Sequence, residues 1–303
     1  MSTTLPAAKQ RFWPWPRRHR PFGYLYVAPV IVWFFGFNLF PMGIGLWLSL
    51  TDWNILKPPQ FIGLANYVHM LSDSLFWRSM ENTFYFAFVS VGLGTVLSLA
   101  LAVALNQKLG AVSIYRTLFF LPAVTALIAV AMVWRWLYDT EYGLINWVLS
   151  LVGIPPLRWL DDPHLAMLAV ILMSVWRSAG FNTIIFVAGL QGIPTEYQEA
   201  ASIDGANRWQ RFLNITLPLI SPSTFFVAVN SLIGAWQVFD QVWAMTQGNP
   251  ENSTVTTVFL IYQNAFAWGK TGYASSLAYL LFVVIMVFTW LQFRLQKRWV
   301  FYQ

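Results

Sequence analysis

The chain has 303 residues, of which 57% are hydrophobic and only 10% are charged, and its mean hydropathy is +0.55. Soluble domains carry a charge on roughly a quarter of their residues, so this composition indicates a membrane protein. The formal net charge is +6, but the basic residues gather at the ends of apolar segments, which favours membrane topology over nucleic-acid binding. The lack of cysteine excludes disulfides and thiolate metal sites.

Six apolar segments are long enough to cross a bilayer, which takes about 20 helical residues. In chain order they run approximately over Tyr24–Leu50, Thr83–Leu105, Leu118–Tyr138, Leu165–Leu190, Ser221–Met245 and Ser276–Leu295. Backbone polar groups in lipid must pair within their own segment, and the alternating short strands of a barrel are missing. The predicted fold class is therefore an all-α membrane protein with six transmembrane helices.

The parts between the spans predict the topology. Residues 1–23 form a basic tail, which is no signal peptide because the apolar run after it is too long and no small-residue cleavage site is evident. With this tail in the cytoplasm, the inner segments hold 12 Lys and Arg residues and the outer loops hold 4. This asymmetry predicts that both termini are cytoplasmic and that residues 24–303 form one membrane domain. The long outer loops, 51–80 and 139–164, are expected to face an external partner.

The inner loop 191–219 has its own helical pattern. Thr195 and Gln198 have the spacing of a capping box, and Gly205 suits a helix end. Arg208 to Phe212 then resemble a second, short amphipathic helix. From the residues alone, a loop that rests on lipid headgroups explains this pattern as well as a docking element does.

The spacing of this loop resembles the signature of one transporter family. It matches the "EAA" motif in the permeases of binding-protein-dependent ABC importers at Glu199, Ala200, Ala201, Gly205, Ile215, Leu217 and Pro218. In that family the loop is a cytoplasmic coupling helix, which docks on the ATP-binding subunit and transmits its movement. The resemblance therefore implies an ATPase-coupling role for Glu199, Ala200, Ala201 and Gly205.

Further motifs resemble the carbohydrate permeases of the maltose and glycerol-3-phosphate type. They are Gly63–Tyr67, Glu81–Thr83, Phe120–Pro122, Trp236–Asp240 and Thr246–Pro250. In the last motif Asn249 replaces the commoner glycine, a change we expect to affect a loop only. The resemblance implies a type I ABC importer permease in a bacterial inner membrane. Its partners would be a second homologous permease, a dimer of ATP-binding subunits and an extracytoplasmic solute-binding protein.

Polar residues within spans are costly and are therefore candidate substrate ligands. By resemblance to the maltose permease, the substrate-facing positions are Ser174, Arg177, Ser178, Phe181 and Ser231. The residues themselves add Asn182, Trp236, Asp240 and Thr125. Several have a structural alternative: Arg177 could pair with Asp240 or extend to the interface, Asp240 could support a gate, and Ser231 or Thr125 could bond its own helix.

The predicted function is a permease subunit that translocates a sugar or sugar-like solute. The chain lacks a Walker A motif, a His cluster and any nucleophile–base pair, so we expect no enzyme activity, metal or cofactor in this chain, with ATP and Mg bound by partner subunits. The alternatives are an ion-coupled secondary carrier and a membrane scaffold or insertase. The solute stays open among disaccharides, glycosylated polyols, and glycerol-3-phosphate or its diesters.

Overall fold

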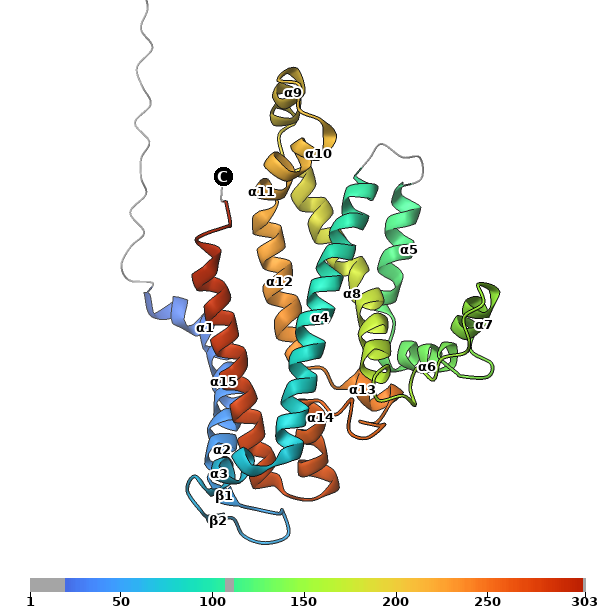
Figure 1. Ribbon diagram of the computed structural model, residues 1–303. Helices are drawn as coiled ribbons and strands as arrows, with labels where there is room; N and C mark the ends of the chain where they lie inside the picture. Colours follow the sequence, from blue (N-terminus) through green and yellow to red (C-terminus); the bar gives the residue numbers. More distant parts are fainter. Residues whose placement is uncertain (1–19, 107–111, 302–303) are drawn as a thin grey trace, which may run out of the picture. The chain divides into compact units, whose positions relative to one another are not determined.

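The computed structural model describes residues 20–106 and 112–301, so the predicted tail lies almost wholly outside the described residues (Figure 1). The chain divides into two units, residues 1–47 and 48–303. The first unit contains α1 (Arg20–Phe34), the π-helical turn η2 (Phe35–Leu39) and most of α2 (Phe40–Ser49). Its apolar side chains are largely exposed, as expected of a helix that meets lipid.

Three straight helices of the second unit are long and apolar enough to cross a membrane. They are α4 (Ser74–Leu105), α8 (Ala166–Gln191) and α15 (Thr271–Gln296). Two bent pairs pass the same test: α5 (Val112–Val124) with α6 (Leu127–Leu137), and the helical stretch 208–219 with α12 (Ser221–Trp236). A further candidate span covers Tyr24–Ser49. The described residues therefore hold four unbent candidate spans, or up to six if each bent pair is one span. This agrees with the six predicted.

Two of the predicted spans are not continuous helices. α5 and α6 meet at 106°, and Thr125 stands at the break with its hydroxyl donating to the carbonyl of Pro122 at 2.8 Å. The span predicted to run to Met245 ends at Trp236, and a separate short helix, α13 (Asp240–Met245), follows. The carbonyl of Val238, between them, accepts from the hydroxyl of Thr256 at 2.9 Å, which stabilises this break.

Close packing around α8 forms the centre of the second unit. α4 and α5 both lie against α8, and α12 contacts α4, α8 and α15. At Gly180 an added Cβ would lie 1.8 Å from the carbonyl oxygen of Phe119, so only glycine permits α5 to approach α8 this closely. The buried core runs from Phe76 and Phe86 on α4 to Trp236.

The helical loop 191–219 and the connections after α13 complete the unit. The loop holds α9 (Thr195–Ile203), α10 (Arg208–Arg211), the π-helical turn η3 (Phe212–Thr216) and α11 (Leu217–Leu219). In Figure 1 α9 and α10 lie at the end of the second unit where α4 and α8 finish. After α13 come α14 (Thr257–Tyr262) and the π-helical turn η4 (Gln263–Ala267), which leads to α15.

The two predicted outer loops contain regular structure. In loop 51–80, β1 (Thr51–Asp52) pairs antiparallel with β2 (Gln60–Phe61), and α3 (Ala65–Ser72) follows. Loop 139–164 contains α7 (Leu144–Leu151). Buried Asn146 organises this loop: its amide donates to the carbonyl of Leu157 at 2.9 Å, and its oxygen accepts from the indole N–H of Trp159 at 3.0 Å.

The Glu81–Thr83 motif anchors a distant segment. The amide of Asn82 donates to the carbonyls of Asn252 and Val255 at 3.0 and 2.9 Å, and the hydroxyl of Thr83 accepts from the backbone N–H of Thr257 at 2.9 Å. These bonds, two of which are buried, tie α4 to the start of α14 and to the chain before it. The motif therefore has a structural role in this fold.

Candidate functional site

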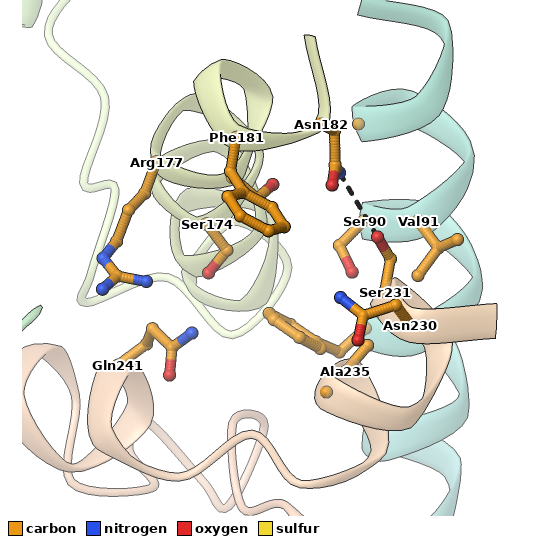
Figure 2. Close-up of a pocket in the computed structure, with 14 residues that line it drawn as sticks. Ser90, Val91, Ser174, Arg177, Phe181, Asn182, Asn230, Ser231, Ala235 and Gln241 are labelled. Atoms are coloured by element: carbon orange, nitrogen blue, oxygen red, sulfur yellow. Dashed lines mark hydrogen bonds between the residues drawn. The ribbon is translucent and has the colours of Figure 1, made fainter. Parts of the chain in front are cut away.

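A cavity of about 310 Å³ lies between α4, α8, α12 and α13 (Figure 2). Its walls combine hydroxyl, amide and guanidinium groups with phenyl rings and small residues. The lining residues are Phe86, Ser90, Val91, Gly94, Ser174, Arg177, Ser178, Phe181, Asn182, Asn230, Ser231, Gly234, Ala235 and Gln241. Six of the nine predicted substrate residues are among them.

The wall from α8 follows helical spacing. Ser174, Arg177, Ser178 and Phe181 recur at intervals of three and four residues, which places them on one face of the helix. The hydroxyls of Ser174 and Ser178 donate to the carbonyls four and three residues earlier, at 2.8 and 3.3 Å. Their oxygen atoms therefore present acceptor lone pairs to the cavity. Phe181 is 45% exposed, which leaves its ring open to a ligand.

Among the described residues, Arg177 is the one cation of the cavity wall. Its Nε is buried and has no hydrogen-bond partner. The described part of the chain contains no ion pair of Arg177, so the alternative of a pair with Asp240 is not formed. Figure 2 shows the side chain extending from α8 on the side of the cavity where Gln241 of α13 lies. A charged donor left unsatisfied is costly in a membrane domain, unless a ligand completes its bonds.

Asn182 and Ser231 join the α8 wall to the α12 wall. The amide of Asn182, which is only 4% exposed, donates to the hydroxyl of Ser231 at 3.3 Å. Asn230 beside them has an exposed side chain. Gly234, one turn further along α12, has open space where a Cβ would stand.

Three predicted residues lie outside this lining. Trp236 is 1% exposed and packs against Phe84 and Phe288, with ring centroids 4.5 and 5.2 Å apart. Asp240 is exposed in the first turn of α13, and Thr125 bonds the backbone at the α5–α6 break. Sequence reasoning missed the wall from α4. Its only signal is that Ser90 and Gly94 are a polar and a small residue one turn apart in an apolar span.

The predicted coupling loop is exposed at its first helix. Glu199 and Ala200 are exposed and Ala201 is half-buried. Gly205 has φ +80° directly after the end of α9, which confirms the predicted helix end. Ile203, in the last position of α9, is 86% exposed.

The predicted capping box at Thr195 is wrong. α9 already begins at Thr195, so the cap position is Pro194, whose side chain accepts no hydrogen bond. The amide of Gln198 instead donates to the hydroxyl of Thr216 at 3.1 Å, which ties α9 to η3. A capping box does form one helix later, where Asn207 and Gln210 exchange two bonds of 2.9 Å at the start of α10.

The model of the family described as "Binding-protein-dependent transport system inner membrane component" matches residues 94–300. The chain belongs to this family. A probable ABC transporter permease, YesP of Bacillus subtilis, is 38% identical over 93% of this chain and 92% of its own length. The trehalose/maltose permease MalF of Thermococcus litoralis is 37% identical over 90% of this chain and 92% of its own length.

Solved structures agree with the family assignment. A chain of a bacterial ABC transporter that imports the acidic polysaccharide alginate is 25% identical, with a TM-score of 0.83 over 93% of this chain and 96% of that chain. A chain of an amino acid ABC transporter has 16% identity and a TM-score of 0.52, which is a likeness of fold alone. The architecture is thus that of an ABC importer permease.

Family membership decides between the functions that the sequence left open. This permease is a multi-pass membrane component of a binding-protein-dependent ABC importer, and not an ion-coupled carrier or a scaffold. It is not an enzyme, because ATP hydrolysis in such importers belongs to a separate subunit.

Proposed function

We propose that this permease forms half of the translocation path for a sugar or sugar-like solute, and that the cavity between α4, α8, α12 and α13 binds that solute on its way through. The observation that carries the proposal is the chemistry of the cavity wall. Serine hydroxyls, the amides of Asn230 and Gln241 and the guanidinium of Arg177 stand around the exposed ring of Phe181. Ligand sites for small polar solutes combine apolar or aromatic surface with a few converging polar groups in this way.

Each kind of group suits a hydroxyl-rich solute. The serine oxygens accept from sugar hydroxyls, Arg177 donates to them, and the ring of Phe181 covers the apolar face of a pyranose. No carboxylate of the described part of the chain lines the cavity. This favours a neutral or anionic solute over a cationic one, because a cation beside Arg177 would have no counter-charge.

The names of the relatives support this class of solute. Besides the trehalose/maltose permease, they include a lactose permease of Rhizobium radiobacter at 36% identity and a sn-glycerol-3-phosphate permease of Yersinia pestis at 35%. These solutes share several hydroxyl groups and no positive charge. Within that class we favour a neutral sugar or a sugar-like anion, either of which Arg177 could bind.

The proposed assembly follows from the family. A second homologous permease would complete the path, an extracytoplasmic protein would deliver the solute, and a dimer of ATP-binding subunits would hold ATP and Mg. Exposed Glu199, Ala200 and Ile203 of α9, with Ala201 and the turn at Gly205, form the surface that we propose docks on an ATP-binding subunit. This requires loop 191–219 and both termini to be cytoplasmic, in a bacterial inner membrane, as the distribution of basic residues predicts.

The test is the ATPase activity of the purified complex with its binding protein, measured across sugars, polyols and glycerophosphates. Stimulation by one of these classes would support the proposal and identify the solute class. A folded complex that responds to none of them, or that responds to amino acids, would overturn it. Glu199→Lys should remove the stimulation and reduce co-purification of the ATP-binding subunit. An unchanged response of this variant would overturn the coupling role alone.

A further inference from the structure

A second cavity, of about 630 Å³, lies where α4 and α8 meet the α9–η3 loop. It is separate from the candidate solute cavity, with which it shares no lining residue. Its lining is rich in cationic, amide and hydroxyl side chains and consists of Val103, Asn106, Leu190, Gln191, Ile193, Thr195, Gln198, Arg208, Arg211, Phe212 and Thr216.

The charge of this lining is one-sided. Arg208 and Arg211 both face the cavity, and no aspartate or glutamate of the described residues lines it. Among the described residues neither arginine forms an ion pair. The Nε of Arg211 is buried and has no hydrogen-bond partner. Two guanidinium groups at one cavity without a counter-ion leave a positive potential that an anion would satisfy.

The ends of α4 and α8 offer a different explanation for the arginines. Helix C-termini carry partial negative charge, and a nearby arginine can bond their last carbonyls. Among the described residues, the buried Nε of Arg211 donates to no such carbonyl and to no other acceptor. In the last turn of α8, the backbone N–H of Gly192 already donates to the carbonyls of Ala188 and Gly189 at 3.2 Å, and that of Ile193 donates to the carbonyl of Leu190 at 3.3 Å. Helix-end stabilisation therefore leaves the Nε donor of Arg211 unused.

We propose that this cavity binds a phosphate-bearing anion, held by Arg208 and Arg211 with help from the amides of Asn106 and Gln191. A phosphate group matches the planar donor fork of arginine and accepts several bonds at once. The ligand would touch the ends of α4 and α8 and the loop of α9 and α10 together. Its binding would thus link the mobility of this loop to the ends of two spans.

The same chemistry has two sources, a phospholipid headgroup of the adjacent leaflet and a soluble phosphate ester. The experiment is hydrogen exchange of the intact transporter complex in nanodiscs, followed over residues 195–216. One arm compares discs of phosphatidylcholine with discs that contain phosphatidylglycerol. The other arm titrates inorganic phosphate into phosphatidylcholine discs, with chloride of equal ionic strength as the reference.

The expected result is exchange at least threefold slower over 195–216 in one or both arms. Slowing with phosphatidylglycerol identifies a headgroup, and slowing with phosphate identifies a soluble ester. Arg208→Gln with Arg211→Gln should raise the phosphate concentration that gives half-maximal slowing about tenfold or more, as expected for lost bonds to a charged group, and should remove the slowing by phosphatidylglycerol. Arg298→Gln, which removes an exposed arginine outside the cavity, should leave the response unchanged.

Two results would overturn the proposal. The first is that neither anion slows exchange in the unmodified complex. The arginines would then serve only the helix ends, even if the double variant were less stable. The second is that the anions slow exchange in the double variant as much as in the unmodified complex. Should the double variant not fold, Arg208→Gln alone provides the test, because Arg208 is exposed in the fold and its loss should still weaken the response.

Discussion

Filling the solute cavity from Gly234 should stop transport without disturbing the fold. Gly234 lines the cavity in the last turns of α12, and a Cβ added there meets no atom within 4 Å. Replacing glycine by another residue within a helix also favours the helix by up to about 1 kcal/mol. Gly234→Leu should therefore fold normally and project its side chain into the cavity.

The size of the effect follows from the volume. Truncating a buried leucine leaves a void on the order of 100 Å³, so the new side chain should take roughly a third of the 310 Å³ cavity. It also stands one turn from Asn230 and Ser231, so a solute would lose hydrogen bonds to both. Two lost bonds cost about 1–3 kcal/mol together. Uptake should accordingly fall roughly 5- to 150-fold.

The assay is uptake of labelled solute by proteoliposomes that contain the whole complex, with saturating binding protein. Gly92→Leu is the matched control, because Gly92 lies on α4, also has open space for a Cβ and does not line the cavity. Gly234→Ala adds a side chain of intermediate size and should reduce uptake less than Gly234→Leu does. If Gly234→Leu transports as fast as Gly92→Leu while both complexes are intact, the cavity is not on the solute path.

Substitutions at four further positions test particular contacts. Arg177→Met should reduce solute-stimulated ATPase activity about tenfold or more, because it removes a charged donor to the solute; Arg177→Lys should recover part of this activity, and equal activity of all three proteins would show that Arg177 does not touch the solute. Asn82→Ala should lower the free energy of unfolding by about 1–3 kcal/mol, since the carbonyl of Val255, in a buried bond, and the carbonyl of Asn252, in a part-buried one, lose their donor; thermal unfolding of the complex measures this, and an unchanged melting temperature would refute it. Asn146→Ala should make loop 139–164 sensitive to limited proteolysis while the helical core stays resistant, because five bonds organise the loop through that side chain; an uncut loop would refute the role. Gly180→Leu should prevent α5 from packing on α8 and abolish assembly, because even a Cβ meets the carbonyl of Phe119; a stable complex on size-exclusion chromatography would contradict the packing.

The number of spans could be predicted from sequence, because hydropathy reports the length of each apolar segment. The bends could not. Thr125 and Val238 mark breaks that depend on particular hydrogen bonds, one local and one to Thr256 18 residues away. Neither bond changes the hydropathy of its segment. The sequence spacing also predicts a capping box at Thr195. The spacing does not show where the helix starts, and α9 begins one residue too early for this box to form.

The α8 wall of the cavity was predictable and the α4 wall was not. Polar residues at intervals of three and four on α8 indicate one face, and the resemblance to the maltose permease pointed to the same positions. On α4, Ser90 and Gly94 look like ordinary small residues of an apolar span. Trp236 is the opposite case, a residue that the sequence predicts in the site and that lies outside it. The sequence does not reveal that this side of α12 turns toward Phe84 and Phe288 and away from the cavity.

The central claim is that this permease carries a hydroxyl-rich solute through a path driven by ATP. The most direct measurement is solute uptake by proteoliposomes of the complete complex, with ATP inside or absent and with the binding protein present or omitted. The account predicts uptake of a sugar or sugar-like solute only when both are supplied. Uptake that persists without ATP and follows an imposed proton or sodium gradient would contradict it.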